Sequence, residues 1–149
     1  MTNDNCSVSF VSSDDDNNIL IESMAFIPEG RIEEKTRNER CDYNRFIQEG
    51  KCIACGNKTV DYSVIEQFVF DIEKTYGCEI VSIGFDRYNC LSSAQKWQQK
   101  YETVEVRQHS DTLHPVTKLL CERITDGKVR YANNKLLEIN FENAKCIVS

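Results

Sequence analysis

The feature that most constrains the fold is an alternation of helix and strand patterns in the second half of the chain. Apolar side chains recur at helical spacing through residues 64–76, namely Val64, Ile65, Phe68, Val69, Ile72 and Tyr76. Asp61 can cap this helix at its start, and Gly77 can end it. The apolar run at residues 80–85 then predicts a buried strand that delivers Asp86 at its carboxyl end.

The remaining patterns extend this alternation in both directions. Residues 7–12 and 19–27 predict a β-hairpin, and a short amphipathic helix is expected within residues 31–51. A helix begun by Ser92 or Ser93 and a strand at residues 103–106 are expected next. The following helix has Pro115 in its first turn, and its inward-facing side chains are expected to be Val116, Leu119, Leu120 and Ile124. A helical stripe from Leu136 to Ala144 and a strand starting near Cys146 complete the order. This order favours an α/β sheet with helices on its faces.

Bulk properties limit the class of protein. A chain of 149 residues, 40% of them hydrophobic, suits one globular domain, so we expect a single domain over residues 1–149. No apolar run approaches the roughly 20 residues that span a bilayer, and the N-terminus lacks a secretory signal. A cytoplasmic location without membrane partners is therefore expected, with most of the eight cysteines reduced. A net charge of −6 argues against a DNA-binding protein that works alone, because phosphate neutralisation drives DNA affinity.

Seven segments, taken in order, resemble the nuclease domain of the large terminase subunit of tailed phages. They are residues 26–30 (FIPEG), 42–50 (DYNRFIQEG), 60–62 (VDY), 83–89 (IGFDRYN), 114–120 (HPVTKLL), 126–128 (DGK) and 143–144 (NA). The ordered set covers nearly the whole chain, and this order gives the resemblance its strength.

The resemblance implies a ribonuclease H-like α/β fold, a mixed sheet flanked by helices. It also implies an endonuclease that cuts concatemeric phage DNA during packaging. In that family, acidic residues from the first strand, a later strand and a C-terminal helix bind two divalent metals, and Asp86 matches the later-strand ligand. Carboxylate ligands suit Mg²⁺ or Mn²⁺, and two ions about 4 Å apart would clamp the attacking and leaving oxygens of a phosphodiester. The implied partners are double-stranded DNA, the rest of the large subunit, the small terminase subunit and the portal, in the cytoplasm of the host cell.

The same resemblance predicts that the chain is part of the domain. The first-strand aspartate is expected before Met1, because Asp4 falls in the turn after that strand, and the C-terminal aspartate is expected beyond Ser149. The sequence contains no G-x-x-x-x-G-K-[ST] loop, so no ATPase domain is expected. We therefore predict a domain without its first strand and C-terminal helix, not catalytic by itself. Asp4 is the candidate substitute metal ligand, whereas the run at residues 14–16 is better explained as a solvated turn.

Three basic residues are candidates for contact with nucleic acid. Arg87 follows Asp86 directly and suits a phosphate contact, and Lys118 and Lys128 belong to the basic second half of the chain. Each of these residues could equally belong to an ordinary charged surface. Asp86 has an alternative role too, because an aspartate at a strand end often caps the next helix or turn.

Parts of the sequence also suggest functions other than a nuclease. Cys52 and Cys55 have the spacing of half a zinc site, but no second C-x-x-C is present, and two buried or loop thiols explain them better. His109 and His114 precede or start a predicted helix, where surface or capping roles are commoner than acid–base catalysis. A non-catalytic binding module, such as a prophage remnant, a decoy or a protein recognised by another protein, remains the main alternative to the nuclease.

Overall fold

The structure, a computed structural model, describes residues 4–145 and forms two compact units. One unit comprises Asp4–Val60 together with the segment from Lys128 onward, and we call it the β2 unit after its central strand. The other comprises Asp61–Gly127, and we call it the β4 unit. The predicted single domain would include both units, and each is described by itself.

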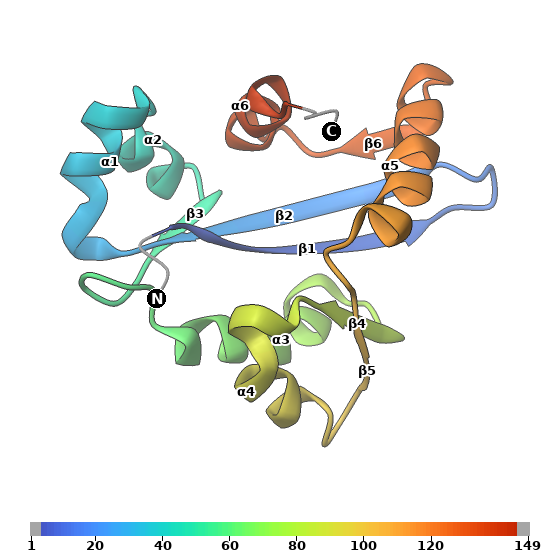
Figure 1. Ribbon diagram of the computed structural model, residues 1–149, viewed down its shortest axis with the longest axis horizontal. Coiled ribbons are helices and arrows are strands. Elements are labelled where there is room, and N and C mark those ends of the chain that lie inside the picture. Colours follow the sequence, from blue (N-terminus) through green and yellow to red (C-terminus); the bar gives the residue numbers. More distant parts are fainter. Residues whose placement is uncertain (1–3, 146–149) are drawn as a thin grey trace. The chain divides into compact units, whose positions relative to one another are not determined.

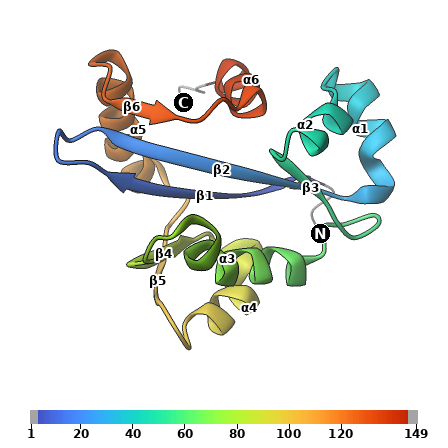
Figure 2. The ribbon, with the colours of Figure 1, turned by 180° about the vertical axis from the view of Figure 1, so that it is seen from behind.

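The β2 unit is built on a four-stranded mixed sheet. Strands β1 (Cys6–Ser13) and β2 (Ile19–Ile27) form an antiparallel hairpin that pairs Cys6 with Phe26 and Ser13 with Ile19. On its other edge β2 pairs in parallel with two short strands, β3 (Cys52–Ala54) and β6 (Val129–Tyr131). Figure 1 and the reverse view in Figure 2 show β2 as the long strand between these neighbours.

The helices of the β2 unit close its core. They are the 3₁₀ turn η1 (Glu29–Arg31), α1 (Ile32–Glu39), α2 (Tyr43–Gln48) and α6 (Lys135–Asn143). Their apolar side chains pack with those of the sheet in one buried cluster, formed by Ile27, Cys41, Tyr43, Phe46, Cys52 and Leu136. The glycine at the end of the FIPEG segment has a packing role, because a Cβ at Gly30 would lie 2.9 Å from the Asn57 carbonyl oxygen.

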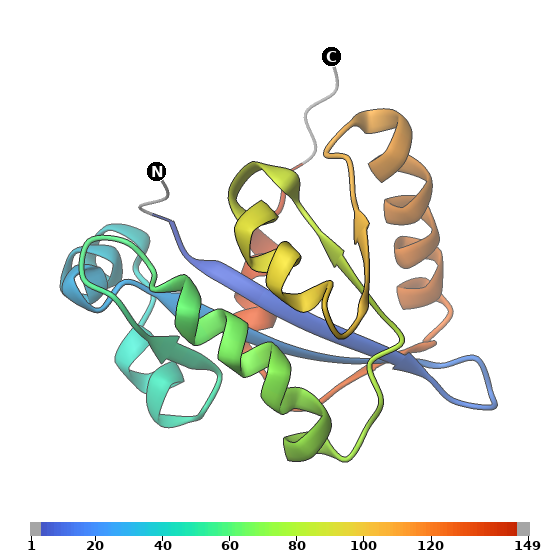
Figure 3. The ribbon, with the colours of Figure 1, turned by 90° about the horizontal axis from the view of Figure 1, so that it is seen from below.

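The β4 unit contains a two-stranded parallel sheet, β4 (Ser82–Phe85) with β5 (Glu102–Glu105). Its helices are α3 (Tyr62–Tyr76), α4 (Arg87–Trp97) and α5 (Ser110–Thr125). As predicted, the Asp61 carboxylate caps α3, and Gly77 ends it with a positive φ of 64°. Figure 3 shows α4 beside β4 and β5, within reach of α3.

A polar network joins α3 to α4. The Glu66 carboxylate is buried and accepts hydrogen bonds from Ser93 Oγ at 2.8 Å and Lys96 Nζ at 2.7 Å. Trp97 Nε1 donates to the Glu66 carbonyl oxygen at 3.4 Å, which places the only tryptophan of the sequence in this interface. These bonds satisfy a carboxylate that would otherwise be costly to bury.

Several predicted elements differ from the observed ones. The expected helix within residues 31–51 is two helices, because Arg40 adopts a left-handed conformation (φ 52°) and Asp42 caps a new helix at Tyr43. The helix expected to start at Ser92 or Ser93 begins at Arg87. The helix expected to start at Pro115 begins at Ser110, so Pro115 lies inside it.

Burial also differs from expectation. Strand β4 is half exposed, and neighbouring Val81 is 82% exposed, because β5 is the one strand in residues 4–145 that pairs with β4. No residue of α5 is buried, and the predicted inward-facing Val116, Leu119 and Ile124 are exposed. Strands β3 and β6 were not predicted, and the strand expected at Cys146 lies outside the described residues. None of the helices described is long and apolar enough to cross a membrane.

Candidate active site

Asp86 lies where the sequence placed it, directly after β4 at the carboxyl end of the strand. The side chain is exposed, and Oδ1 accepts a hydrogen bond from the Tyr88 backbone N–H at 3.1 Å. The carboxylate therefore caps α4, which is the alternative role foreseen for it. Capping uses one oxygen, and no hydrogen bond or ion pair from residues 4–145 involves Oδ2. Asp86 can thus cap the helix and still offer an oxygen to a cation.

A second carboxylate lies at the same end of the neighbouring strand. Phe85 pairs with Glu105 in the parallel β4–β5 register, so Asp86 and Glu105 both lie at the carboxyl ends of adjacent strands. Arg87 Nη1 is 3.9 Å from Glu105 Oε2, and both side chains are largely exposed. This edge of the sheet therefore carries two carboxylates and one guanidinium, in a position where open α/β sheets commonly bind ligands.

The sequence prediction included Asp86 and Arg87 but missed Glu105. Glu105 ends a strand that was itself predicted, and parallel pairing brings the carboxyl ends of both strands together. The pairing of these two strands is the feature that would have indicated Glu105. The local sequence pattern predicts each strand but does not specify which strand it pairs with.

Two carboxylates can hold a divalent cation only in part, because Mg²⁺ and Mn²⁺ take about six oxygen ligands. Water and substrate oxygens commonly complete such a shell. Within residues 4–145, no group of three or more His, Cys, Asp or Glu side chains is placed to hold a metal ion. The carboxylates at this edge would therefore need further ligands to hold a metal ion.

Comparisons with known proteins show the family and the fold of this chain. The family model for the terminase large subunit endonuclease domain matches residues 1–149. The chain belongs to this family. The fold is also similar to the crystal structure of the HK97 bacteriophage large terminase, with a TM-score of 0.77 and 22% sequence identity over 87% of this chain and 27% of that chain. No curated protein matches the chain.

These similarities confirm the predicted fold, a mixed α/β arrangement like that of the ribonuclease H-like terminase nuclease domain. The chain spans about a quarter of the length of the HK97 protein, since it covers 27% of it. The predicted absence of the family's first strand and C-terminal helix stays a prediction.

The other predicted acidic residues of this terminase domain lie in the β2 unit. Asp4 is exposed in a bend before β1. Asp14 stabilises the β1–β2 turn, because its carboxylate accepts hydrogen bonds from the Asn18 side chain and from the Asn18 and Asp16 backbone N–H groups. The bonds from Asn18 hold the pKa of Asp14 below its usual range. Asp14 thus has a structural role in the turn.

The predicted DNA-contacting residues have different surroundings. Lys118 is exposed on α5 and makes no ion pair within the described residues. Lys128 is half-buried, and its ammonium donates to the Asp16 carbonyl oxygen at 3.3 Å, so it is tied to the hairpin turn. Arg87 pairs weakly with Glu105, as described above. Of the three, Lys118 and Arg87 are accessible enough for a phosphate contact.

The cysteines proposed as half a zinc site are buried. Cys52 is 2% and Cys55 6% exposed, and nearby Cys41 is also buried. Burial, followed by the neighbouring Cys41 and Cys55, raises the pKa of Cys52 to about 12. Within residues 4–145, these thiols do not form a group of three or more His, Cys, Asp or Glu side chains that could hold a metal ion. The surroundings favour the structural role for both thiols, and the zinc site stays a prediction without support in the described residues.

The two histidines are both exposed near the start of α5. His109 precedes the helix as its N-cap residue without a side-chain cap bond, and its Nδ1 is 3.9 Å from Asp111 Oδ1. Neither histidine is held by a buried partner of the kind that orients a catalytic base.

Proposed function

We propose that this chain is part of the endonuclease that cuts concatemeric phage DNA during packaging. The supporting observation is the exposed Asp86 carboxylate at the carboxyl end of β4, in a member of the terminase endonuclease family. An accessible carboxylate at a strand end, followed directly by an arginine, is suited to hold a cation against a phosphate.

In this proposal Asp86 is a ligand of Mg²⁺ or Mn²⁺, and Glu105 supplies a second carboxylate at the same edge. A metal pair would stabilise the attacking and leaving oxygens of the phosphodiester. Arg87 would contact a phosphate of the DNA, and Lys118 would add to the positive charge that meets the duplex.

We further propose that this chain is not catalytic alone and requires carboxylates in addition to Asp86. These would come from the family's first strand and C-terminal helix, with Asp4 as the candidate substitute within the chain. The rest of the large subunit, the small subunit, the portal and double-stranded DNA would be its partners, in the host-cell cytoplasm. The net charge of −6 supports dependence on other parts for DNA binding.

Plasmid nicking in Mn²⁺ tests the proposal, with the chain as it stands and with the chain extended at both ends by the two family segments. We expect nicking in the extended form. We expect Asp86→Asn to reduce it at least about a hundredfold, because metal ions supply several kcal/mol of transition-state stabilisation. Asparagine caps helices as well as aspartate does, so Asp86→Asn removes the charge while keeping the cap.

The matched control is Asp71→Asn, which removes an exposed carboxylate from α3 in the same unit and should leave nicking unchanged. If Asp86→Asn nicks as fast as the unaltered extended chain, Asp86 is a helix cap and not a metal ligand. If the extended chain does not nick at all, the nuclease proposal fails.

The second candidate is a non-catalytic binding module. The observation in its favour is α5, a helix of 16 residues whose Val116 and Leu119 are 57% and 50% exposed. Exposed apolar side chains on one helix are typical of a surface that meets another protein. A pull-down with this chain and with Leu119→Lys tests it, since a true partner should be lost with the variant. Absence of any specific partner would remove this candidate.

A further inference from the structure

Strand β1 leaves one edge of the sheet in the β2 unit open. Within residues 4–145 it pairs with β2 alone, and this pairing runs without a bulge from Cys6 opposite Phe26 to Ser13 opposite Ile19. The strand has eight residues, whereas β3 and β6 have three each and β4 and β5 have four each. An open strand edge presents backbone N–H and C=O groups that can bind a further strand.

The hydrogen bonds of β2 show which residues of β1 direct their backbone groups to the open edge. On the side away from β1, the Ala25 N–H donates to the Lys51 carbonyl oxygen at 3.2 Å. The Ile27 carbonyl oxygen accepts from the Cys55 N–H at 3.0 Å on that same side. Backbone groups alternate between the two sides of a strand, so the even-numbered residues of β2 bond to β1. In the observed register, the β1 residues whose backbone groups point away from β2 are therefore Ser7, Ser9, Val11 and Ser13.

The sequence of β1 lacks the features with which proteins protect an open edge. Its residues, CSVSFVSS, include no charged side chain and no proline. By comparison, the edge strand β5 has a glutamate at each end, Glu102 and Glu105. The Val11 side chain is 61% exposed, and the side chains of Ser7, Ser9 and Ser13 are exposed too. The edge is therefore accessible along its length.

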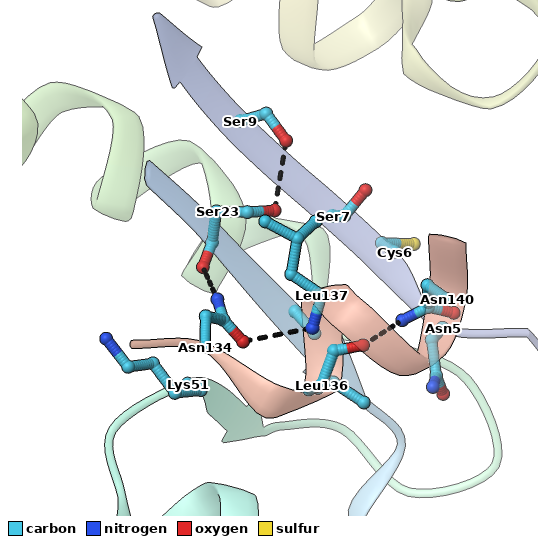
Figure 4. A pocket seen from close by; sticks show the side chains of 11 residues that line it. Asn5, Cys6, Ser7, Ser9, Ser23, Lys51, Asn134, Leu136, Leu137 and Asn140 are labelled. Carbon is cyan, nitrogen blue, oxygen red and sulfur yellow. Dashed lines mark hydrogen bonds between the residues drawn. The ribbon is translucent and has the colours of Figure 1, made fainter. Parts of the chain in front are cut away.

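The two faces of β1 differ in chemistry. Val8 and Phe10 are half-buried on one face of the sheet. Ser7 and Ser9 lie on the other face, where they line an open pocket together with residues of α6 (Figure 4). On that face Ser9 Oγ is 3.0 Å from Ser23 Oγ of β2. A strand that pairs with β1 must therefore offer apolar side chains on the first face and small polar ones on the second.

We propose that two copies of this chain pair antiparallel through their β1 edges, about a two-fold axis perpendicular to the sheet. A second β1 has the required alternation of apolar and small polar side chains. With Ser9 opposite Val11 of the second copy, the outward backbone groups of both strands bond to each other, and Phe10 lies opposite Phe10 of the second copy. An uncharged edge meets itself without repulsion. Such a contact uses the same surface on both copies, so association stops at the dimer.

Sedimentation velocity and amide hydrogen exchange test this proposal, which is independent of the nuclease function. Pairing along one strand buries less than a standard interface, so the measurements should span about 10 µM to 1 mM chain. Salt at about 0.3 M screens the net charge of −6 on each copy. We expect a concentration-dependent dimer. At the highest concentration the amide protons of Ser7, Ser9, Val11 and Ser13 should exchange about tenfold more slowly than at the lowest.

Ser9→Pro removes one outward N–H without removing a bond between β1 and β2, and it should weaken the dimer at least about tenfold. Ser9→Ala is the matched control. Both variants lose the hydroxyl contact with Ser23, but alanine keeps the backbone N–H, so Ser9→Ala should change the dimer affinity less than about twofold. Equal weakening by the two variants would show that the hydroxyl, and not the strand edge, holds the copies together.

A second pair of variants leaves the backbone intact. Val11→Lys places a charge on the edge and should weaken the dimer at least about tenfold. Val116→Lys adds the same charge at a valine of α5 that is 57% exposed, and should leave the dimer unchanged. The proposal is overturned if Val116→Lys dissociates the dimer as Val11→Lys does, or if assemblies larger than two copies form. A chain that stays monomeric at every concentration also overturns it, and leaves the edge to a strand of another polypeptide.

Discussion

The two units of this terminase domain are built in different ways. In the β2 unit, a central strand is paired along both edges, and apolar side chains from the sheet and three helices share one buried cluster. In the β4 unit the sheet has two strands, and α3 is held to α4 by bonds to a buried carboxylate, Glu66. The candidate metal ligand Asp86 lies on the exposed end of the smaller sheet. Substitution of Asp86 should therefore have little effect on the stability of the hydrophobic core.

Thiol reactivity offers the largest contrast between the units. Cys78 and Cys121 of the β4 unit are exposed, whereas Cys41, Cys52 and Cys55 of the β2 unit are buried. Because burial raises the pKa of Cys52 to about 12, its thiolate fraction at mildly alkaline pH is about a thousandfold below that of an ordinary cysteine. We expect a thiol reagent to label Cys78 and Cys121 fast and Cys52 slowly, read by peptide mass spectrometry. Fast labelling of Cys52 in the folded protein would contradict the buried cluster.

Phe46→Ala tests whether the units unfold independently. Phe46 is 3% exposed in the β2 unit, so the change should lower the unfolding free energy of that unit by about 3–5 kcal/mol. Trp97, the only tryptophan, reports on the β4 unit by fluorescence. If the units unfold independently, circular dichroism should show part of the protein unfolding at a lower denaturant concentration in the variant. The midpoint of unfolding reported by Trp97 fluorescence should then stay unchanged. A shift of both probes together would show one cooperative structure. Phe141→Ala, at a half-exposed site on α6, is the control.

Glu66→Ala addresses the polar network of the β4 unit. The variant removes the acceptor of Ser93 and Lys96, and we expect it to destabilise this unit by about 1–3 kcal/mol. Denaturant unfolding followed by Trp97 fluorescence measures the change. Gln67→Ala, at the exposed neighbouring position, should have a smaller effect. Equal effects of the two variants would mean that the network does not stabilise the unit.

Tyr43→Phe tests the hydrogen bonds that join Asn5, Tyr43 and Glu39 in the β2 unit. It removes the bond to Glu39 and should destabilise the β2 unit by about 1 kcal/mol. The lowered pKa of Glu39 means that its stabilising effect is present above the unfolded pKa and is lost as pH falls through the folded pKa. In the variant the pKa of Glu39 should rise, because one of the hydrogen bonds that lowers it is gone. An NMR titration that finds the pKa of Glu39 unchanged would contradict these hydrogen bonds.

The smallest effect is expected on α5. Val116→Ser and Leu119→Ser replace exposed side chains and should change stability by no more than about 0.5 kcal/mol, measured by denaturant unfolding. Ile65→Ser on α3, a buried position of the same unit, provides the contrast and should cost several times more. If the α5 variants cost as much as Ile65→Ser, the helix is covered in the folded protein.

The candidate site was predictable in part. Asp86 was placed at a strand end because the apolar run before it and the polar residues after it are adjacent in sequence. Glu105 was not predicted because its place at the same end of the sheet as Asp86 depends on the pairing of β4 with β5. The buried position of Asn134 was not predictable, because a local pattern does not specify which distant residue an asparagine contacts. Its amide donates to the carbonyl oxygen of Ser23, which is 111 residues away in the sequence.

The sequence by itself determined the elements with strong local signals. The hairpin, the helix capped by Asp61 and ended by Gly77, and the strand before Asp86 follow from periodicity and capping, which neighbouring residues fix together. The tertiary structure decided the rest. Strands β3 and β6 have three residues each and form because they pair with an edge of β2. The exposure of α5 depends on which residues pack against its apolar side chains. Pairing and burial join residues far apart in the chain, and no local pattern specifies them.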